Sequence, residues 1–273
     1  MEAILSDNDI MKPPTCPVKD CSLPIDIVLR SSDGIELGAH MRNLEHYSEA
    51  FPQSGSVEVN SEAEAVTLDE TGDVLELMLQ FMHLTRQPEL AKISFDLLSG
   101  LAEAVEKYMI YSAMSMCKLY MGYALKEHPL DVLMYSSKHN YDMMANECAP
   151  LTLKYKSETV VRKANEKCLH DSFLLKWFRC RDIHNQAVRT ILKADGIYSK
   201  KSNGSHHSCG LWDSLKKEVQ LESFKFEFAT IQDIRDLIDT KSSSVLSCVP
   251  CTRAAHEWRS QAKQAVIPVF SDM

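Results

Sequence analysis

The sequence is poor in glycine and has no long apolar segment. Its nine glycines leave little material for the Gly-rich loops that bind phosphate groups, and no such loop, His-Glu-x-x-His helix or paired-carboxylate signature occurs. No run of about 18 apolar residues could span a membrane, and residues 1–7 lack the basic, apolar and small residues of a signal peptide. The sequence therefore predicts an intracellular protein, cytoplasmic or nuclear, that is not an enzyme and has no membrane partner.

Basic side chains are scarce in the first 125 residues. That part holds 20 acidic and 8 basic residues, a net charge of −12, whereas residues 126–273 hold 18 and 22, a net charge of +4. An acidic surface repels a phosphate backbone, so general nucleic-acid binding is disfavoured there. The hydrophobic fraction of 45%, with 25% charged residues, is typical of a globular protein. The uneven charge predicts two parts with different surfaces.

Residues 25–51 predict a β-hairpin followed by a short helix. Ile25, Ile27 and Leu29 alternate with polar residues, which is the period of a half-buried strand. The segment Ser32-Asp33-Gly34 supplies turn chemistry, and the alternation resumes after it. Residues 66–68 predict a further short strand.

Apolar residues at helical spacing predict helices over most of the remaining chain. Asp73, with Glu76 three residues on, is expected to cap one helix, and Ser94 is expected to cap the next. Pro150 is expected to stop a helix that begins at Tyr141. A small sheet followed by helical pairs predicts an α+β domain that continues into a mainly α-helical region.

Several motifs of this chain, in this order, resemble those of the BTB/POZ domain. They are Asp26-Ile-Val-Leu, Ala39-His40, the Ser48-x-x-Phe51 pair, Phe81-Met82-His83 where the family usually reads Phe-Ile-Tyr, and the helix Leu101–Tyr108. The resemblance covers about residues 24–125 and is closest to the BTB proteins abundant in fungi. It implies a BTB/POZ fold, a small sheet with helical hairpins, that acts as a protein-interaction module. BTB proteins often serve as substrate adaptors for cullin-3 ubiquitin ligases, so the resemblance also implies this role. It puts Glu62 or Glu64 near the place where the adaptor contacts the cullin.

The resemblance assigns interface roles to Asp26, His40 and the residue after it. In BTB dimers this Asp and a basic residue after the His form a charged pocket at the subunit interface, and the His packs under the sheet. Met41 stands here in place of the basic residue. An unpaired Asp is costly to bury, so either Arg42 substitutes or Asp26 stays hydrated. We therefore expect weakened dimerisation through this face.

The nine cysteines, an odd number scattered through the chain, argue against a secreted disulfide framework and for reduced thiols. Two pairs, His206-x-x-Cys209 and Cys248-x-x-Cys251, have the residue types of a tetrahedral zinc site, with His207 or His256 as alternatives to His206. Unliganded thiols and a redox Cys-x-x-Cys are the alternatives. The other cysteines, Cys16 and Cys21 among them, are expected to be packing residues or free thiols.

A second hypothesis assigns the C-terminal region to a zinc-organised nucleic-acid-binding or regulatory protein. It rests on these His/Cys pairs and on the pairs Lys200-Lys201 and Lys216-Lys217. The overall charge of the chain argues against this hypothesis, because nucleic-acid-binding surfaces are strongly basic. The sequence thus predicts four parts: a flexible arm over residues 1–23, a BTB/POZ domain over 24–125, a helical extension over 126–193 and a Cys/His-containing helical region over 194–273.

Overall fold

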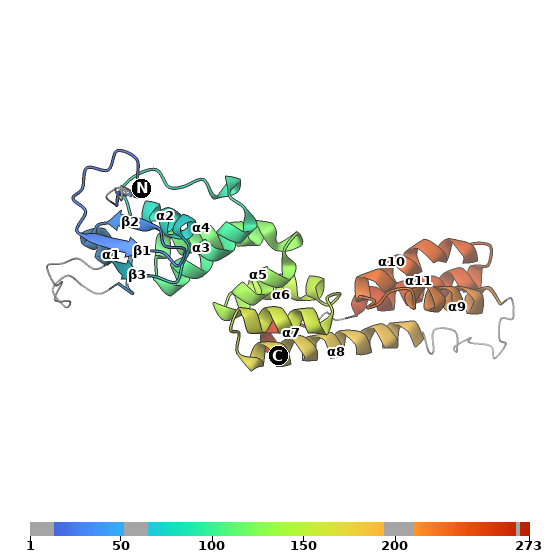
Figure 1. The fold of residues 1–273 in the computed structure, drawn as a ribbon. Coiled ribbons are helices and arrows are strands. Elements are labelled where there is room, and N and C mark those ends of the chain that lie inside the picture. Colours follow the sequence, from blue (N-terminus) through green and yellow to red (C-terminus); the bar gives the residue numbers. More distant parts are fainter. Residues whose placement is uncertain (1–13, 52–64, 194–209, 266–267) are drawn as a thin grey trace, which may run out of the picture. The chain divides into compact units, whose positions relative to one another are not determined.

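The computed structural model describes residues 14–51, 65–193, 210–265 and 268–273 (Figure 1). The chain divides into two compact units, Met1–Ala124 and Leu125–Met273. The first combines a small sheet with helices and the described part of the second is helical, so the predicted mixed α+β class is confirmed.

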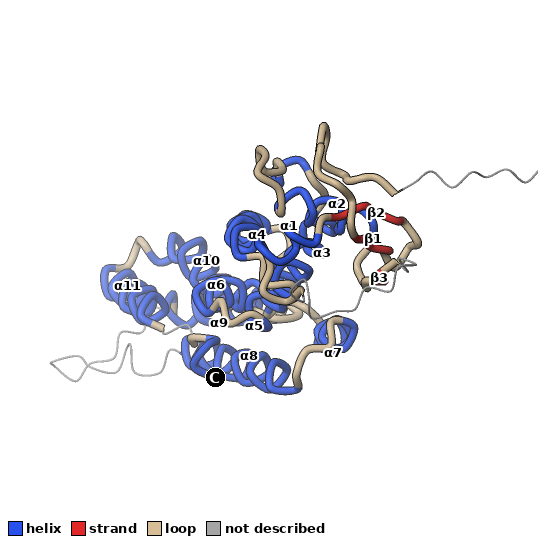
Figure 2. The backbone as a smooth tube through the Cα atoms, turned by 90° about the vertical axis from the view of Figure 1, so that its left-hand side faces the viewer, coloured by secondary structure: helices blue, strands red, loops and turns tan. Residues whose placement is uncertain are grey.

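The sheet of the first unit is built on the predicted hairpin (Figures 1 and 2). Strands β1 (Ile27–Arg30) and β2 (Glu36–Ala39) pair antiparallel, and β3 (Val66–Thr67) pairs parallel to β1, giving the order β2-β1-β3. The hairpin turn needs a residue with a positive φ, which Gly34 supplies at 85°. The Ser31 backbone N–H donates to the Ile35 carbonyl at 2.9 Å and closes the turn.

Helices pack behind this sheet and bury most of the apolar side chains of the unit. They are α1 (Met41–Tyr47), α2 (Gly72–Phe81), η1 (Leu90–Lys92), α3 (Phe95–Lys107) and α4 (Tyr111–Tyr123). Helix α2 packs against α3, and α3 against α4. Phe81 and Leu101 on these helices are 1% and 0% exposed, so both belong to the buried core of the unit.

Two helix ends differ from the sequence prediction. Thr71, not Asp73, is the N-cap residue of α2, and the first-turn N–H of Gly72 donates to the Asp33 carboxylate at 2.9 Å. The hairpin turn therefore supplies the acceptor that local capping was expected to provide. Pro150 does not stop its helix; it lies in the last turns, where its missing N–H removes only the bond to the carbonyl four residues earlier. The Ser94 cap is confirmed, since its hydroxyl accepts the Leu97 N–H.

The second unit contains α5 to α11 and short 3-10 turns. Their bounds are α5 (Pro129–Lys138), α6 (Asp142–Thr152), α7 (Ser157–Glu166), α8 (Asp171–Lys193), α9 (Leu211–Ser223), α10 (Ile231–Lys241), η3 (Ser242–Val245), α11 (Val249–Gln264) and η4 (Phe270–Asp272), with η2 (Ala124–Lys126) at the division. The C-terminal η4 packs against α6 and α8.

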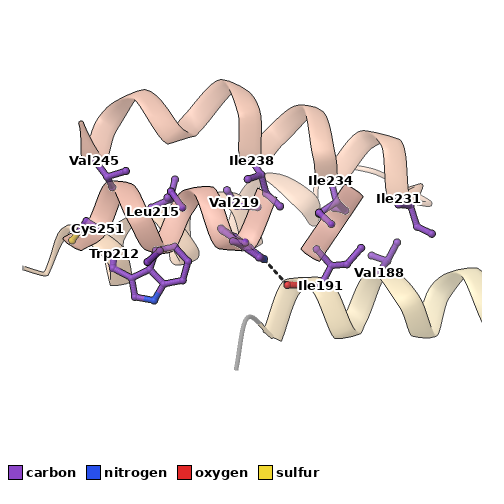
Figure 3. Packing of buried hydrophobic residues seen from close by; sticks show 14 residues of the cluster. Val188, Ile191, Trp212, Leu215, Val219, Ile231, Ile234, Ile238, Val245 and Cys251 are labelled. Atoms are coloured by element: carbon purple, nitrogen blue, oxygen red, sulfur yellow. Dashed lines mark hydrogen bonds between the residues drawn. The ribbon is translucent and has the colours of Figure 1, made fainter. Parts of the chain in front are cut away.

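A core of buried apolar residues joins the end of α8 to α9, α10 and α11 (Figure 3). Trp258 is 0% exposed, its indole N–H donates to the Ile191 carbonyl at 2.7 Å, and its ring meets Trp212 edge to face at 5.5 Å. Val188 and Ile191 of α8 belong to the same cluster. The helical extension and the C-terminal region, expected to be separate parts, therefore share one compact unit.

His184 on α8 is a buried histidine held in its neutral form. Its Nε2 accepts the Ile231 backbone N–H at 2.9 Å at the start of α10, and its buried Nδ1 has no hydrogen-bond partner among the described residues. Burial lowers the pKa of His184 from its ordinary value of 6.5, while Asp233 raises it and Arg235 lowers it. Protonation would replace the lone pair that accepts the Ile231 N–H.

We expect the second unit to lose stability as the pH falls below 6.5, the ordinary histidine pKa. The folded-state pKa of His184 is depressed, so the unfolded chain binds the proton more readily and is favoured in acid. Denaturation followed by tryptophan fluorescence at about pH 8 and about pH 5 measures this, because all three tryptophans lie in the second unit. His184→Gln should reduce the change in unfolding free energy between the two pH values. An equal change in the wild type and the variant would contradict this prediction.

Candidate metal centre

Four side chains with metal-binding chemistry meet in the first unit. Cys16, Cys21, His40 and His83 each offer one ligand atom, and the four atoms lie within 4.8 Å of one another. Both histidines are buried, and both cysteines are partly buried. The ligands come from three places: the segment before β1, the junction of β2 with α1, and the second residue after the end of α2.

The segment before β1 is placed by backbone hydrogen bonds. The Gly38 N–H of β2 donates to the Thr15 carbonyl at 3.0 Å, and Val18 is buried. The Cys21 N–H donates to the Val18 carbonyl at 3.2 Å, closing a tight turn in which Asp20 has a positive φ of 59°. This turn brings Cys21 back beside Cys16. Residues 14–23 thus pack on the unit, which differs from the flexible arm expected over residues 1–23.

Both histidines are oriented by backbone carbonyls. His40 Nδ1 lies 2.7 Å from the Pro24 oxygen, and His83 Nδ1 lies 2.8 Å from the Leu79 oxygen in the last turn of α2. A carbonyl only accepts, so each Nδ1 carries the proton and donates it. In the neutral rings each Nε2 keeps its lone pair, and both Nε2 atoms face the thiols. Metal-binding histidines in proteins are commonly oriented in this way.

The spacing of the ligand atoms suits a tetrahedral ion. The Sγ–Nε2 distances are 3.4 Å for Cys16 with His83, 3.3 Å for Cys21 with His40 and 3.7 Å for Cys21 with His83. Zinc lies about 2.3 Å from sulfur and about 2.0 Å from nitrogen, which puts neighbouring ligand atoms roughly 3.6 Å apart around a tetrahedron. The rings of His40 and His83 meet edge to face at 5.2 Å, so both can approach one point.

The same four groups can satisfy one another without an ion when each thiol donates to an imidazole nitrogen. Burial, and then the neighbouring Cys21, raise the pKa of the Cys16 thiol, although a bond to the Val18 backbone lowers it. A divalent cation at the centre would reverse this balance, because bound thiols ionise and release their protons. Four protein ligands would then fill the tetrahedral shell.

The C-terminal set predicted from the sequence is only partly described. His206 and Cys209 lie outside the described residues, so the set His206, Cys209, Cys248 and Cys251 stays a prediction. Cys248 is the residue before α11, and Cys251 in the first turn of that helix is 0% exposed within the core of the second unit.

Two of the three interface residues implied by the resemblance, Asp26 and His40, line a pocket next to the metal-binding cluster, and Met41 is not among its lining residues. Asp26 is exposed, and its Oδ1 accepts the Met41 backbone N–H at 2.7 Å at the start of α1. A pocket of about 450 Å³ is lined by Asp26 and His40 together with Leu23, Pro24, Arg42, Asn43, His46, Tyr47 and Leu84. His40 therefore belongs both to the pocket wall and to the metal-binding cluster.

Sequence reasoning assigned Cys16 and Cys21 to packing or free thiols, whereas the structure brings them to His40 and His83. The sequence contains only a weak indication of this cluster. Cys16 and Cys21 are five positions apart shortly before the hairpin, but His83 is 67 positions from Cys16 and belongs to no short metal-binding motif. The one local hint is that His83 occupies the place of the tyrosine in the BTB pattern.

No family model matches this chain, and no curated protein or solved structure matches it. Among the described helices none is both long enough and apolar enough to cross a membrane.

Proposed function

We propose that this chain is a BTB-type protein-interaction protein whose first unit carries a structural zinc ion on Cys16, Cys21, His40 and His83. The first unit offers the interaction surface, and the ion fastens residues 14–23 to the sheet and to α2. Cullin-3 is the partner class that the resemblance implies.

The observation that carries the BTB assignment is the contact between two motifs that lie far apart in the sequence. The Ser48 hydroxyl donates to the Tyr108 carbonyl, and the Phe51 ring stacks on the Tyr108 ring at 4.8 Å. The Tyr108 hydroxyl donates to Glu70 at 2.8 Å. Burial, together with this carboxylate, raises the pKa of Tyr108 to about 12, so the phenol stays a donor. Two of the motifs on which the resemblance rests, Ser48-x-x-Phe51 and Leu101–Tyr108, thus contact each other, which supports the proposal.

The donor set supports zinc over the common hard cations. Magnesium and calcium take oxygen ligands, whereas thiolate and imidazole together suit zinc. With four protein ligands no position stays open for water or substrate, which is the arrangement of structural rather than catalytic zinc sites.

Metal content of the full chain tests the zinc proposal. We expect about one zinc per chain after purification without added metal or chelator, as a structural site binds tightly. Cobalt(II) exchanged into the site should give the visible absorption of a tetrahedral ion with thiolate ligands. The control is Cys168→Ser, because Cys168 is exposed and outside the cluster. A chain that neither contains zinc nor takes up zinc or cobalt would refute the metal assignment.

Binding of the cullin-3 N-terminal region to the immobilised full chain tests the interaction role. Glu62 and Glu64, which the resemblance puts near the cullin contact, lie outside the described residues. We expect saturable binding that weakens at least about tenfold when both are changed to lysine, because reversed charge near a contact opposes association. The control carries the same reversal at Glu166 and Glu257, which are exposed residues of the second unit. No binding at micromolar concentration would remove cullin-3 as the partner.

Met41→Lys is expected to strengthen self-association of the chain. Asp26 is exposed and bonded to the Met41 backbone N–H, which leaves its carboxylate accessible to a lysine from a second copy. Light scattering over a range of concentrations should show a monomeric wild-type chain and a larger dimer fraction for Met41→Lys, with Met41→Leu as the uncharged control. A wild-type dimer at nanomolar concentration would show that dimerisation does not depend on a charge pair between Asp26 and a basic residue at position 41.

A further inference from the structure

The two cysteines of the metal centre differ from the buried thiols elsewhere in the chain. Cys16 and Cys21 are partly exposed, whereas Cys117, Cys148 and Cys180 are buried. Burial raises the pKa of these three thiols to about 12, 12 and 11, so they stay protonated and react slowly. An oxidant that enters from solvent would therefore meet Cys16 and Cys21 in preference to these three.

The two sulfurs are also placed to bond to each other. Their Sγ atoms lie no more than 4.8 Å apart, and a disulfide needs about 2.05 Å. Both belong to one short segment with a tight turn at Val18 to Cys21. Both cysteines precede β1, so the gap can close without a change in the pairing of β1 with β2.

We propose that hydrogen peroxide converts Cys16 and Cys21 to a disulfide and thereby releases the zinc ion. This inference rests on the zinc site proposed above and adds its regulation. The centre would hold the ion under reducing conditions and lose it under oxidising ones, and a dithiol reductant would restore the ligands.

The chemistry balances with peroxide as the only oxidant. One thiolate attacks the O–O bond and becomes a sulfenic acid, while the other peroxide oxygen leaves and takes a proton to form water. The second thiolate attacks the sulfenic sulfur and forms the S–S bond, and the hydroxide that leaves takes a second proton. The sum is two thiolates, one peroxide and two protons giving one disulfide and two waters. The ion then keeps only His40 and His83 and dissociates.

Oxidation would also loosen the wall of the pocket beside the centre. Cys21 lies two residues before Leu23, which lines the pocket with Pro24. The Pro24 carbonyl holds His40, and His40 Nε2 faces Cys21, so the wall and the ligands form one connected set. Withdrawal of Cys21 into a disulfide removes the ion that fastens this segment, and residues 14–24 should then exchange amide hydrogens faster.

The experiment treats the zinc-loaded full chain with hydrogen peroxide and follows zinc with a chromogenic chelator. Trypsin then cuts after Lys19, between the two cysteines, so a disulfide appears as a cross-linked pair of peptides. We expect one zinc released per cross-link formed, and rebinding after a dithiol reductant is added. Cys168→Ser should behave as wild type.

Cys16→His is the matched variant, because it keeps four ligands for zinc but leaves only one thiol. It should retain its zinc and lose it at least about tenfold more slowly in peroxide, since no second thiolate can complete a disulfide. Zinc-loaded wild-type chain that keeps its ion, or releases it without the cross-link, would overturn the redox inference and leave the zinc site standing. A chain that cannot be loaded with zinc would overturn both proposals.

Discussion

Replacing Cys21 by serine is expected to abolish zinc binding and to lower the stability of the first unit. The loss should be about 4 kcal/mol when free zinc exceeds the dissociation constant about 1,000-fold, because a ligand that binds only the folded state stabilises it by mass action. Cys21 is the ligand chosen for replacement because its sulfur lies near both His40 and His83, at 3.3 and 3.7 Å. Serine keeps the size of the side chain but is a poor zinc ligand.

The measurement compares denaturation of wild-type and Cys21→Ser chains, each with zinc and with chelator. Circular dichroism reports both units and tryptophan fluorescence only the second, so a transition seen by circular dichroism alone belongs to the first unit. The chelator should shift this transition in the wild type and leave it unchanged in Cys21→Ser. Equal wild-type stability with and without chelator would show that the four side chains hold no structural ion.

His83→Tyr gives a second route to the same conclusion, since it introduces the residue that the BTB/POZ domains resembled by this sequence usually have at this position. It removes a ligand while keeping an aromatic ring at the end of α2. We expect zinc to be lost and the sheet and helices of the first unit to remain. Together the two variants separate the contribution of the ion from that of the packing around it.

Local features of this fold could be predicted from the sequence, because their cause is local. Strand alternation at Ile27 and Leu29, and a glycine with a positive φ at position 34, place the hairpin. The Ser94 hydroxyl caps its own helix three residues away. In each of these cases the interacting groups are close neighbours in the chain, so spacing alone indicates the contact.

Features that depend on distant contacts could not be predicted in this way. The acceptor at the start of α2 is Asp33, 39 positions before Gly72. The candidate metal centre depends on the same kind of contact, because Cys16 in the segment before β1 meets His83 after α2 across 67 positions of the chain. The structure also joins α8 to α9, α10 and α11 through buried side chains. Helical spacing predicts which face of each helix is apolar, but it does not predict which helices pack together.

Trp258→Ala is expected to destabilise the second unit by about 3–5 kcal/mol, the usual cost of truncating a large aromatic side chain in a tight core. Trp258 is 0% exposed and belongs to a core cluster with residues from α8, α9 and α10. The truncation leaves a cavity against Trp212 and removes the donor to the Ile191 carbonyl. Fluorescence of the two remaining tryptophans follows this unit in chemical denaturation.

Two further variants divide this effect into its causes. Trp258→Phe keeps most of the apolar volume but leaves the Ile191 carbonyl without its indole donor, and should cost about 1–3 kcal/mol. Glu257→Ala changes the exposed neighbour on the same helix and should stay within about 0.5 kcal/mol of wild type. If Trp258→Ala were no worse than Glu257→Ala, α11 would not be held by this core. The joining of α8 to the last three helices would then depend on other contacts, such as the bond between His184 and Ile231.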